Sequence, residues 1–297
     1  MPGLDARDRL LTHLHALIGE RHPITSPVHL QQVEEYIADT FEQLGLQVSL
    51  HPFQAMGGTY RNVFASLLPT HQARDRGSSP APLILAAHYD TVEGSPGADD
   101  NASAVAVLLE TARRLRGVDR MREIHCIGFC LEEEGFLGSL AYTAELKATK
   151  RNIAGALVLE CVGYASSEDG SQTVPPGTPI AVPTIGNFLA VVGNAASAAL
   201  TASVEQAAKP HVPIVPLVVP GNGELLPDTR RSDHAAFWHY GFPAVMLTDT
   251  ANFRNPNYHR STDTIETLNL GFLEQVTAAV TASAAITLRD KPINKEH

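Results

Sequence analysis

The sequence predicts one α/β domain built on a largely parallel β-sheet. Short apolar runs alternate with amphipathic segments of helical period along most of the chain, which is the pattern of strands and crossover helices in a parallel sheet. The chain has 297 residues, of which 44% are hydrophobic and 18% charged, enough apolar material for one large domain with a buried core. No segment has the character of an interdomain linker, so we expect residues 1–297 to form a single domain.

Two N-terminal helices are expected within residues 5–45. The first covers residues 5–20, and the second covers residues 27–45, where apolar residues recur at helical spacing. Ser26 is a typical N-cap residue, and Pro27 is typical of the first helical position. The same periodicity predicts further helices at residues 102–115, 140–147, 194–208 and 270–288.

Strands are expected where short apolar runs are bounded by glycine, proline or polar residues. These runs cover residues 47–51, 62–68, 83–88, 123–131, 153–162, 212–219 and 244–248. Residues 165–186 are rich in Ser, Pro and Gly and have no period. They predict a long surface loop, and loops of this length are usually functional or mobile. Other loops are expected at residues 70–82 and 220–234.

Composition and charge exclude several classes of protein. The chain has 22 Lys and Arg against 32 Asp and Glu, a formal charge of −10, which disfavours a nucleic-acid partner because phosphate contacts need a basic surface. No run approaches the roughly 20 consecutive apolar residues of a membrane span, and the N-terminus lacks the apolar core of a signal peptide. We therefore expect a cytoplasmic protein without a membrane partner. The sequence carries no signal for an oligomeric state.

The three cysteines lie in apolar runs of the chain. An odd number of cysteines at Cys126, Cys130 and Cys161 fits neither a disulfide framework nor a zinc knuckle. We expect them to be buried free thiols.

Polar residues at the ends of predicted strands are the candidates for function, because open α/β sheets bind ligands at the carboxyl ends of their strands. They come from five segments and are His88 and Asp90, Asp99 and Asp100, Glu132 to Glu134, Glu160, and His259. Ionised carboxylates at the end of an apolar strand are costly unless a positive charge compensates them. A divalent metal would do so, and a mixture of imidazole and carboxylate suits zinc, whereas an all-oxygen site suits calcium or magnesium.

Each segment by itself also has a structural explanation. A strand-end histidine such as His88 is more often a hydrogen-bonded core residue than a ligand. Asp99 or Asp100 could cap the helix that follows. The three consecutive glutamates could be a solvated strand end, and His259 could be an exposed surface residue. Glu160 is harder to explain in this way, because it lies inside the apolar run ALVLECVG, where solvation is not expected.

The segments AAHYDT, PGADDNASA, EEEGFLGS, LECVGY, SDHAAFW and YHRSTDT follow one another in this order. Together they resemble metallopeptidase family M28, the co-catalytic zinc aminopeptidases. The resemblance covers residues 83–268, and the joint match is specific although each motif alone is weak. It implies a zinc exopeptidase-like fold, with a mixed, mainly parallel twisted sheet of about eight strands and helices on both faces.

The resemblance also implies two zinc ions per chain. Asp100, the aspartate three residues before Ser103, would bridge them. The other ligands would be His88 and Glu160 for one ion and Glu133 and His259 for the other. Ala104 stands where many relatives have glycine, which we regard as harmless, and many relatives are secreted, so the missing signal peptide is a departure.

The implied activity is hydrolysis of a peptide or amino-acyl substrate, with release of N-terminal amino acids from short peptides. Glu132 would take a proton from water and deliver it to the leaving amine. Asp90, two residues after His88 and on the same side of the strand, would accept its second ring N–H and orient it. Asp233 and Asp99 would be supporting or substrate-contacting residues.

Other functions are compatible with a similar scaffold. A glutaminyl cyclase would use one zinc on Asp100, Glu133 and His259 only, but YHRSTDT looks more like the peptidases. The M20 peptidases carry an inserted second domain, for which the chain between Glu160 and His259 leaves little room. A catalytically silent binding module usually lacks a ligand or the base, whereas all six residues are present here.

Substrate selectivity is expected to depend on residues 165–186 and 221–232. The side chains that could line or flank a pocket there are Phe188, Leu225, Leu226, Arg230 and Arg231. A different interpretation is that the two arginines only solvate a turn.

Overall fold

The computed structural model describes residues 3–70 and 80–289, so most of the predicted loop at residues 70–82 lies outside the described residues. Eight strands form one sheet in the order β1-β2-β4-β3-β5-β8-β6-β7. The strands are β1 Gln47–Ala55, β2 Gly58–Leu67, β3 Leu83–His88, β4 Ile124–Phe129, β5 Gly155–Glu160, β6 Leu189–Asn194, β7 Ile214–Val219 and β8 Ala244–Thr248. The helices are α1 Ala6–Leu17, α2 Pro27–Gln43, α3 Ala104–Leu115, α4 Leu137–Ala148, α5 Ala198–Ala208, α6 His234–His239 and α7 Leu270–Arg289.

The sheet is mixed, as expected. Strands β3, β4, β5 and β8 run parallel to their neighbours within the centre of the sheet. The β1–β2 hairpin continues antiparallel to β4, and β6 is antiparallel to β8. The predicted α/β class with a mixed eight-stranded sheet is therefore confirmed.

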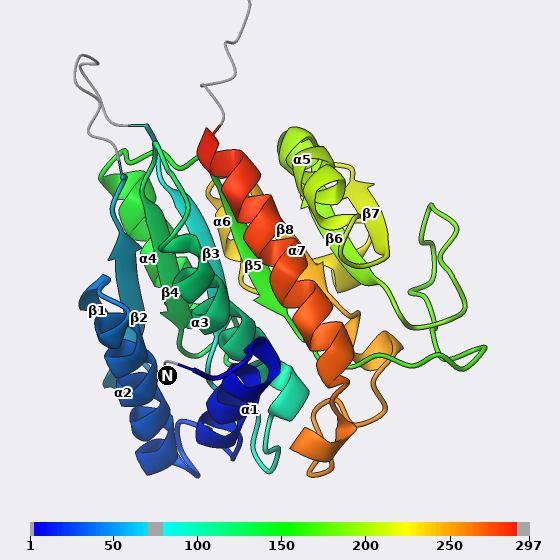
Figure 1. The fold of residues 1–297 in the computed structure, drawn as a ribbon, viewed down its shortest axis with the longest axis horizontal. Coiled ribbons are helices and arrows are strands. Elements are labelled where there is room, and N and C mark those ends of the chain that lie inside the picture. The colour runs from blue at the N-terminus through cyan, green and yellow to red at the C-terminus, as the bar shows by residue number, and fades with distance from the viewer. Residues whose placement is uncertain (1–2, 71–79, 290–297) are drawn as a thin grey trace, which may run out of the picture.

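Helices cover both faces of the sheet (Figure 1). Helices α1, α2, α3, α5 and α7 pack on one face, and α4 and α6 pack on the other. Strand β3 shows why. Its residues Leu83 and Leu85 belong to the hydrophobic core on the face of α3 and α7, and Ile84 and Ala86 belong to the core on the face of α4 and α6. Successive side chains of a strand point to opposite faces of the sheet. A strand that is buried on both sides reads as a continuous apolar run.

Two elements differ from the prediction. The sequence predicts an alanine-rich helix over residues 194–208 and no strand before it. The structure has strand β6 directly before this range, and α5 begins only at Ala198. The apolar run Leu189–Asn194 is six residues long, which is too short to distinguish a strand from a buried helix by period. Helix α6 lies at the end of the predicted loop 220–234 and is only six residues long.

The N-terminal helices have nearly the predicted bounds. Pro27 opens α2 as expected, but the Ser26 side chain makes no capping hydrogen bond. By length and composition, α7 could cross a membrane. Core helices of globular proteins pass the same test, and α7 packs on α3 and α5.

The central parallel strands bring their carboxyl ends to one edge of the sheet. His88, the last residue of β3, pairs with Phe129 of β4, and Glu160, the last residue of β5, pairs with Thr248 of β8. Polar residues at and after these strand ends therefore meet at the same edge.

Candidate metal centre

The five predicted ligands meet at this edge around Asp100. His88 Nε2 lies 3.2 Å from Asp100 Oδ1 and 3.3 Å from Glu160 Oε2. His259 Nε2 lies 3.0 Å from Asp100 Oδ2 and 3.3 Å from Glu133 Oε2. The two carboxylate oxygens of Asp100 therefore face different histidines. The donor atoms of each trio, His88–Asp100–Glu160 and Asp100–Glu133–His259, lie within 4.8 Å of one another.

These donors suit a metal because several of them lack other partners. Both ring nitrogens of His88, both carboxylate oxygens of Asp100 and Glu133 Oε1 are buried and make no well-formed hydrogen bond to any group that the structure describes. Buried polar atoms are nearly always hydrogen-bonded. The explanation of His88 as a hydrogen-bonded core histidine is therefore wrong, and this set of imidazoles and carboxylates fits zinc.

The electrostatics of the cluster point the same way. Burial lowers the pKa of His88, but the carboxylates of Glu132 and Glu160 outweigh it and raise that pKa well above its usual value. Burial, together with the Asp100 carboxylate, raises the pKa of Glu133 to about 7. Burial also opposes ionisation of Asp100, but its contacts with His259 and His88 hold the pKa of Asp100 below its usual range. Without a metal, the imidazoles therefore hold protons that a cation would displace.

Glu132 lies beside the cluster, with Oε2 3.9 Å from His88 Nε2 and 6% of its surface exposed. Burial raises its pKa well above the usual value, and the Glu160 and Glu133 carboxylates add to this effect. The explanation of the three glutamates as a solvated strand end is wrong for Glu132 and Glu133. It fits only Glu134, whose partly exposed side chain lies 3.6 Å from His22.

Asp90 holds the segment that carries Glu132 and Glu133. Its two carboxylate oxygens accept hydrogen bonds from the backbone N–H groups of Glu132 and Glu133, each at 3.1 Å. Asp90 Oδ1 also lies 3.5 Å from His88 Nδ1. No well-formed hydrogen bond joins these two groups, so the predicted acceptance of the His88 ring N–H is not seen. The Asp90 carboxylate instead ties the end of β3 to the segment after β4.

Asp99 is not among the clustered donors, but its side chain supports the turn that carries Asp100. Its carboxylate accepts hydrogen bonds from Gly163 N at 2.8 Å, Asn255 Nδ2 at 2.8 Å and Ser103 Oγ at 3.2 Å. These hydrogen bonds give the Asp99 carboxylate partners within the protein. Neither Asp99 nor Asp100 caps α3, which begins at Ala104 without a side-chain cap, so the cap interpretation is wrong.

Glu160 and Asp233 have different surroundings. Glu160 Oε2 accepts a hydrogen bond from Ser232 Oγ at 2.8 Å, and its Oε1 accepts one from Cys161 Sγ at 3.3 Å. Asp233 is fully buried, and burial raises its pKa to about 7.

All three cysteines are buried free thiols, as expected.

Two residues that hold the site were missed by the sequence analysis. Asp263 accepts hydrogen bonds from the backbone N–H groups of Asp99 and Asp100 at 3.0–3.1 Å, and its place in the motif YHRSTDT could have indicated it. Arg21 is 1% exposed and lies before the part of the chain that carries the motifs, so no local signal pointed to it. Its guanidinium donates to backbone carbonyls of Leu17, Gly19, Tyr89, Pro96 and Gly97.

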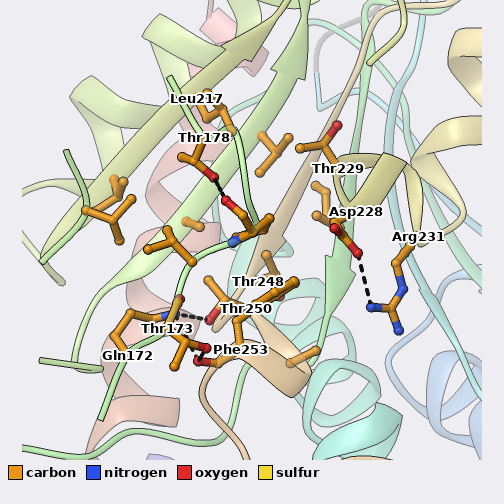
Figure 2. A pocket seen from close by; sticks show the side chains of 18 of the residues that line it. Gln172, Thr173, Thr178, Leu217, Asp228, Thr229, Arg231, Thr248, Thr250 and Phe253 are labelled. Carbon is orange, nitrogen blue, oxygen red and sulfur yellow. Dashed lines mark hydrogen bonds and ion pairs between the residues drawn. The ribbon is translucent and has the colours of Figure 1, made fainter. Parts of the chain in front are cut away.

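An apolar pocket adjoins the cluster, and Figure 2 shows part of its lining. Residues of β6 and β8 that line it belong to the hydrophobic core on the face covered by α4 and α6. Glu160 and Tyr258 line it, and the Tyr258 ring stacks on His259 with ring centroids 3.8 Å apart. Its floor comes from β6, β7 and β8, and its outer wall from loop residues 172–182. Of the side chains predicted to form a pocket, Phe188, Leu226 and Arg231 line it. Leu225 is 83% exposed, and Arg230 borders a separate shallow depression.

Known sequences similar to this one include proteins named as aminopeptidases. The model of Peptidase family M28 matches residues 62–284. The uncharacterized protein YfbL of Escherichia coli K12 is 33% identical over 269 residues, covering 85% of this chain and 79% of YfbL. Aminopeptidase YwaD of Bacillus subtilis 168 is 30% identical over 220 residues, covering 72% of this chain and 44% of YwaD. The chain thus spans about half the length of the named aminopeptidases that it matches.

Solved structures show the same fold. The aminopeptidase from Aneurinibacillus sp. strain AM-1 superposes with a TM-score of 0.73 at 18% identity, covering 97% of this chain and 95% of that chain. The glutaminyl cyclase of Macrostomum lignano gives 0.71 at 20% identity, covering 97% and 91%. BSAP, a zinc aminopeptidase from Bacillus subtilis, gives 0.60 at 28% identity, covering 81% and 53%. The family model spans residues 62–284, which is most of the chain. The chain therefore belongs to peptidase family M28.

Proposed function

We propose that the protein is a zinc-dependent aminopeptidase that holds two zinc ions and releases N-terminal amino acids from short peptides. The observation that carries this proposal is the position of Asp100, whose two oxygens lie 3.2 Å and 3.0 Å from two different histidines. A carboxylate placed in this way can bridge two ions. Similarity to proteins named as aminopeptidases, one of them a zinc enzyme by its name, supports the activity and the metal.

The proposed ligands divide into two sets that share Asp100. His88 and Glu160 would complete one zinc site, and Glu133 and His259 would complete the other. When bound, zinc lowers the pKa of a coordinated water to about 7 and polarises the scissile carbonyl.

Glu132 is the proposed general base. It is buried beside the cluster, and burial raises its pKa well above the usual value, which makes its carboxylate a stronger base than that of an exposed glutamate. It would accept a proton from the attacking water and deliver it to the leaving amine. Such a group contributes a factor of ~10² to 10⁴ in rate, or about 2.7 to 5.4 kcal/mol of barrier.

The pocket beside Glu160 is the proposed site for the N-terminal side chain of the substrate. It has a volume of about 110 Å³, and its lining includes Phe188, Val192, Leu217 and Met246. Burial of an apolar side chain there is worth about 25 cal/mol per Å². We therefore expect a preference for large apolar residues such as leucine over alanine.

We also propose that residues 1–297 work as one peptidase domain in which the helices of residues 5–45 are an integral part. Two contacts support this. The buried Arg21 donates to backbone carbonyls of the segment between β3 and Asp100, and Gly19 N donates to Pro96 O at 2.9 Å.

The test measures zinc and hydrolysis on one preparation. Protein stripped with a chelator is reloaded with zinc, washed and analysed for metal per chain, then assayed on dipeptides and amino-acid anilides. Two tightly held ions with release of N-terminal residues are expected. One ion with cyclisation of N-terminal glutamine would favour a glutaminyl cyclase, two ions without turnover on any substrate would favour a binding module, and no ion would overturn the proposal.

A further inference from the structure

We propose that Arg254 is a positioning residue for substrate selectivity, because it joins the wall of the apolar pocket to the turn that carries Asp100. The inference rests on the proposed function and deepens it. It names the residue that keeps the pocket shaped for a large apolar side chain.

On the pocket side, the Arg254 guanidinium holds two residues that line the pocket. Its Nε donates to Gln172 Oε1 at 2.8 Å, and its Cζ lies 4.5 Å from the centre of the Phe188 ring. Its Nη1 also donates to the backbone oxygen of Tyr164 at 3.3 Å, just before the long loop. Arg254 is 5% exposed, so these contacts form away from bulk water, where they are stronger.

The far end of the long loop packs against the same side chain. A Cβ added at Gly186 would lie 2.9 Å from the Cγ, Cδ and Nε atoms of Arg254. Real Cβ atoms essentially never approach other atoms so closely. Both ends of the loop at residues 165–186 are therefore seated on Arg254.

Neighbouring residues tie the middle of the loop to the segment 250–255 (Figure 2). Gln172 Nε2 donates to Thr250 Oγ1 at 2.8 Å, and Thr173 Oγ1 donates to the backbone oxygen of Phe253 at 2.8 Å. Gln172 thus contacts the segment through its amide nitrogen and Arg254 through its amide oxygen.

On the other side, this segment reaches the turn that carries Asp100. Asn255, the next residue after Arg254, donates through Nδ2 to Asp99 Oδ2 at 2.8 Å. Burial lowers the pKa of Arg254, and the neighbouring carboxyl groups of Asp249 and Asp99 oppose this effect. Weakening the contacts between Arg254 and the long loop should therefore move the pocket wall. The hydrogen bond from Asn255 to Asp99 should still hold the turn that carries Asp100.

The experiment compares three variants that weaken the contacts between Arg254 and the long loop with a control variant that leaves these contacts in place. Arg254→Lys keeps the charge but removes the planar guanidinium. Gln172→Leu keeps the guanidinium but removes the side-chain hydrogen bonds that join Gln172 to Arg254 and Thr250. Gly186→Ala places a methyl group against the Arg254 side chain and forces the loop away from it. The control is Thr184→Ala, which removes a 2.8 Å hydrogen bond inside the same loop, to Asp169 Oδ1. Each is assayed for zinc content and for kcat/KM on the leucine and alanine anilides.

We expect the leucine-to-alanine ratio of kcat/KM to fall about tenfold in the three variants, which is the scale of selectivity that an apolar pocket provides. Zinc content should stay at the wild-type level, because none of the substituted residues is a proposed ligand. Thr184→Ala should behave as wild type. An unchanged ratio in Gln172→Leu and Gly186→Ala would overturn the inference, as would loss of zinc from Gln172→Leu. Because these two variants keep Arg254, they decide the matter even if Arg254→Lys does not fold.

A second measurement is independent of the proposed activity. A glutamate-specific protease is applied to each folded variant, and cleavage after Glu168, in the loop, is followed by mass spectrometry. Cleavage should be faster in the three variants than in Thr184→Ala. If the wild type hydrolyses neither anilide, the proposed function fails, and equal cleavage rates in all variants would then overturn the role of Arg254 by themselves.

Discussion

The metal cluster and the apolar pocket adjoin each other but are built in different ways. The cluster takes its side chains from strand ends and from a turn whose backbone N–H groups are held by Asp263. The pocket takes its floor from β6, β7 and β8, but its outer wall is a long loop held by side-chain contacts such as those of Gln172. Rigid strand ends are suited to fixing donor atoms, and loops are suited to varying selectivity. Changes in the first region should therefore abolish chemistry, and changes in the second should redirect it.

The largest effect is expected from Asp100→Ala. This change removes the carboxylate shared by both trios while leaving the backbone N–H that donates to Asp263. Loss of a residue that only supports a ligand costs 10- to 100-fold in metal affinity, so loss of the shared ligand should cost more than about 100-fold, with hydrolysis falling to background. Metal analysis after dialysis measures this. Asp169→Ala, on the long loop, is the control and should keep its zinc; an Asp100→Ala variant with two retained ions would show that the bridge is assigned to the wrong residue.

The next largest effect is expected from Glu132→Gln, which keeps the shape of the side chain but removes its basicity. Turnover should fall by ~10² to 10⁴, while the zinc content stays unchanged because Glu132 is not among the proposed ligands. Steady-state kinetics and metal analysis on the same sample check this. Glu134→Gln is the matched control, since that side chain is partly exposed and lies near His22. Wild-type turnover in Glu132→Gln would remove it from the mechanism.

A smaller effect should follow deletion of residues 170–182, which removes most of the pocket's outer wall. The leucine-to-alanine ratio of kcat/KM should fall by roughly 10-fold or more, because the apolar pocket loses a wall. The zinc content should stay intact, because none of the proposed ligands lies in the deleted residues. A panel of amino-acid anilides measures the change. An unchanged profile would place selectivity outside this loop, and loss of zinc would show that the two regions are not separable.

A further effect concerns pH and belongs to the cluster alone. Burial lowers the pKa of His259, but its contacts with Asp100 and Glu133 raise it to about 10 in the metal-free site, while Glu133 is raised to about 7. Both must lose protons to bind zinc, so zinc affinity should rise as pH rises from 6 to 8, by up to about tenfold per pH unit for each proton released. Competition with a chromophoric chelator measures this; constant affinity over the range would contradict it.

Metal-free stability should have the opposite dependence. A histidine whose pKa is raised above its unfolded value stabilises the fold fully below the unfolded pKa, and this stabilisation is lost as pH rises through the folded pKa. For His259 the window runs from about pH 6.5 to 10. The raised pKa of Glu133 acts in the same direction, since its ionisation near pH 7 is less favourable in the fold. Thermal unfolding of stripped protein should thus occur at lower temperature as pH rises, whereas zinc should reverse the trend.

The sequence by itself determined the α/β class, the central strands and the candidate residues at their ends. Strands β3 and β5 could be predicted because each is a continuous apolar run that ends in a polar residue, which is a local pattern. The five proposed ligands could be named because the short motifs that carry them jointly resemble those of family M28, whereas each motif alone left a structural explanation open. Strand β6 could not be predicted, because its six residues merge with the alanine-rich helix that follows.

Only the tertiary structure decided how these pieces are held. Asp263 bonds to a turn 163 and 164 residues away, Asn255 bonds to Asp99 156 residues away, and Arg254 bonds to Gln172 82 residues away. Hydrogen bonds of this kind leave no period in the sequence, because they depend on which strands are neighbours in the sheet. Short motifs and their resemblance to a family therefore indicated the candidate donors, whereas the order of the strands determined the distances between them and built the pocket beside them.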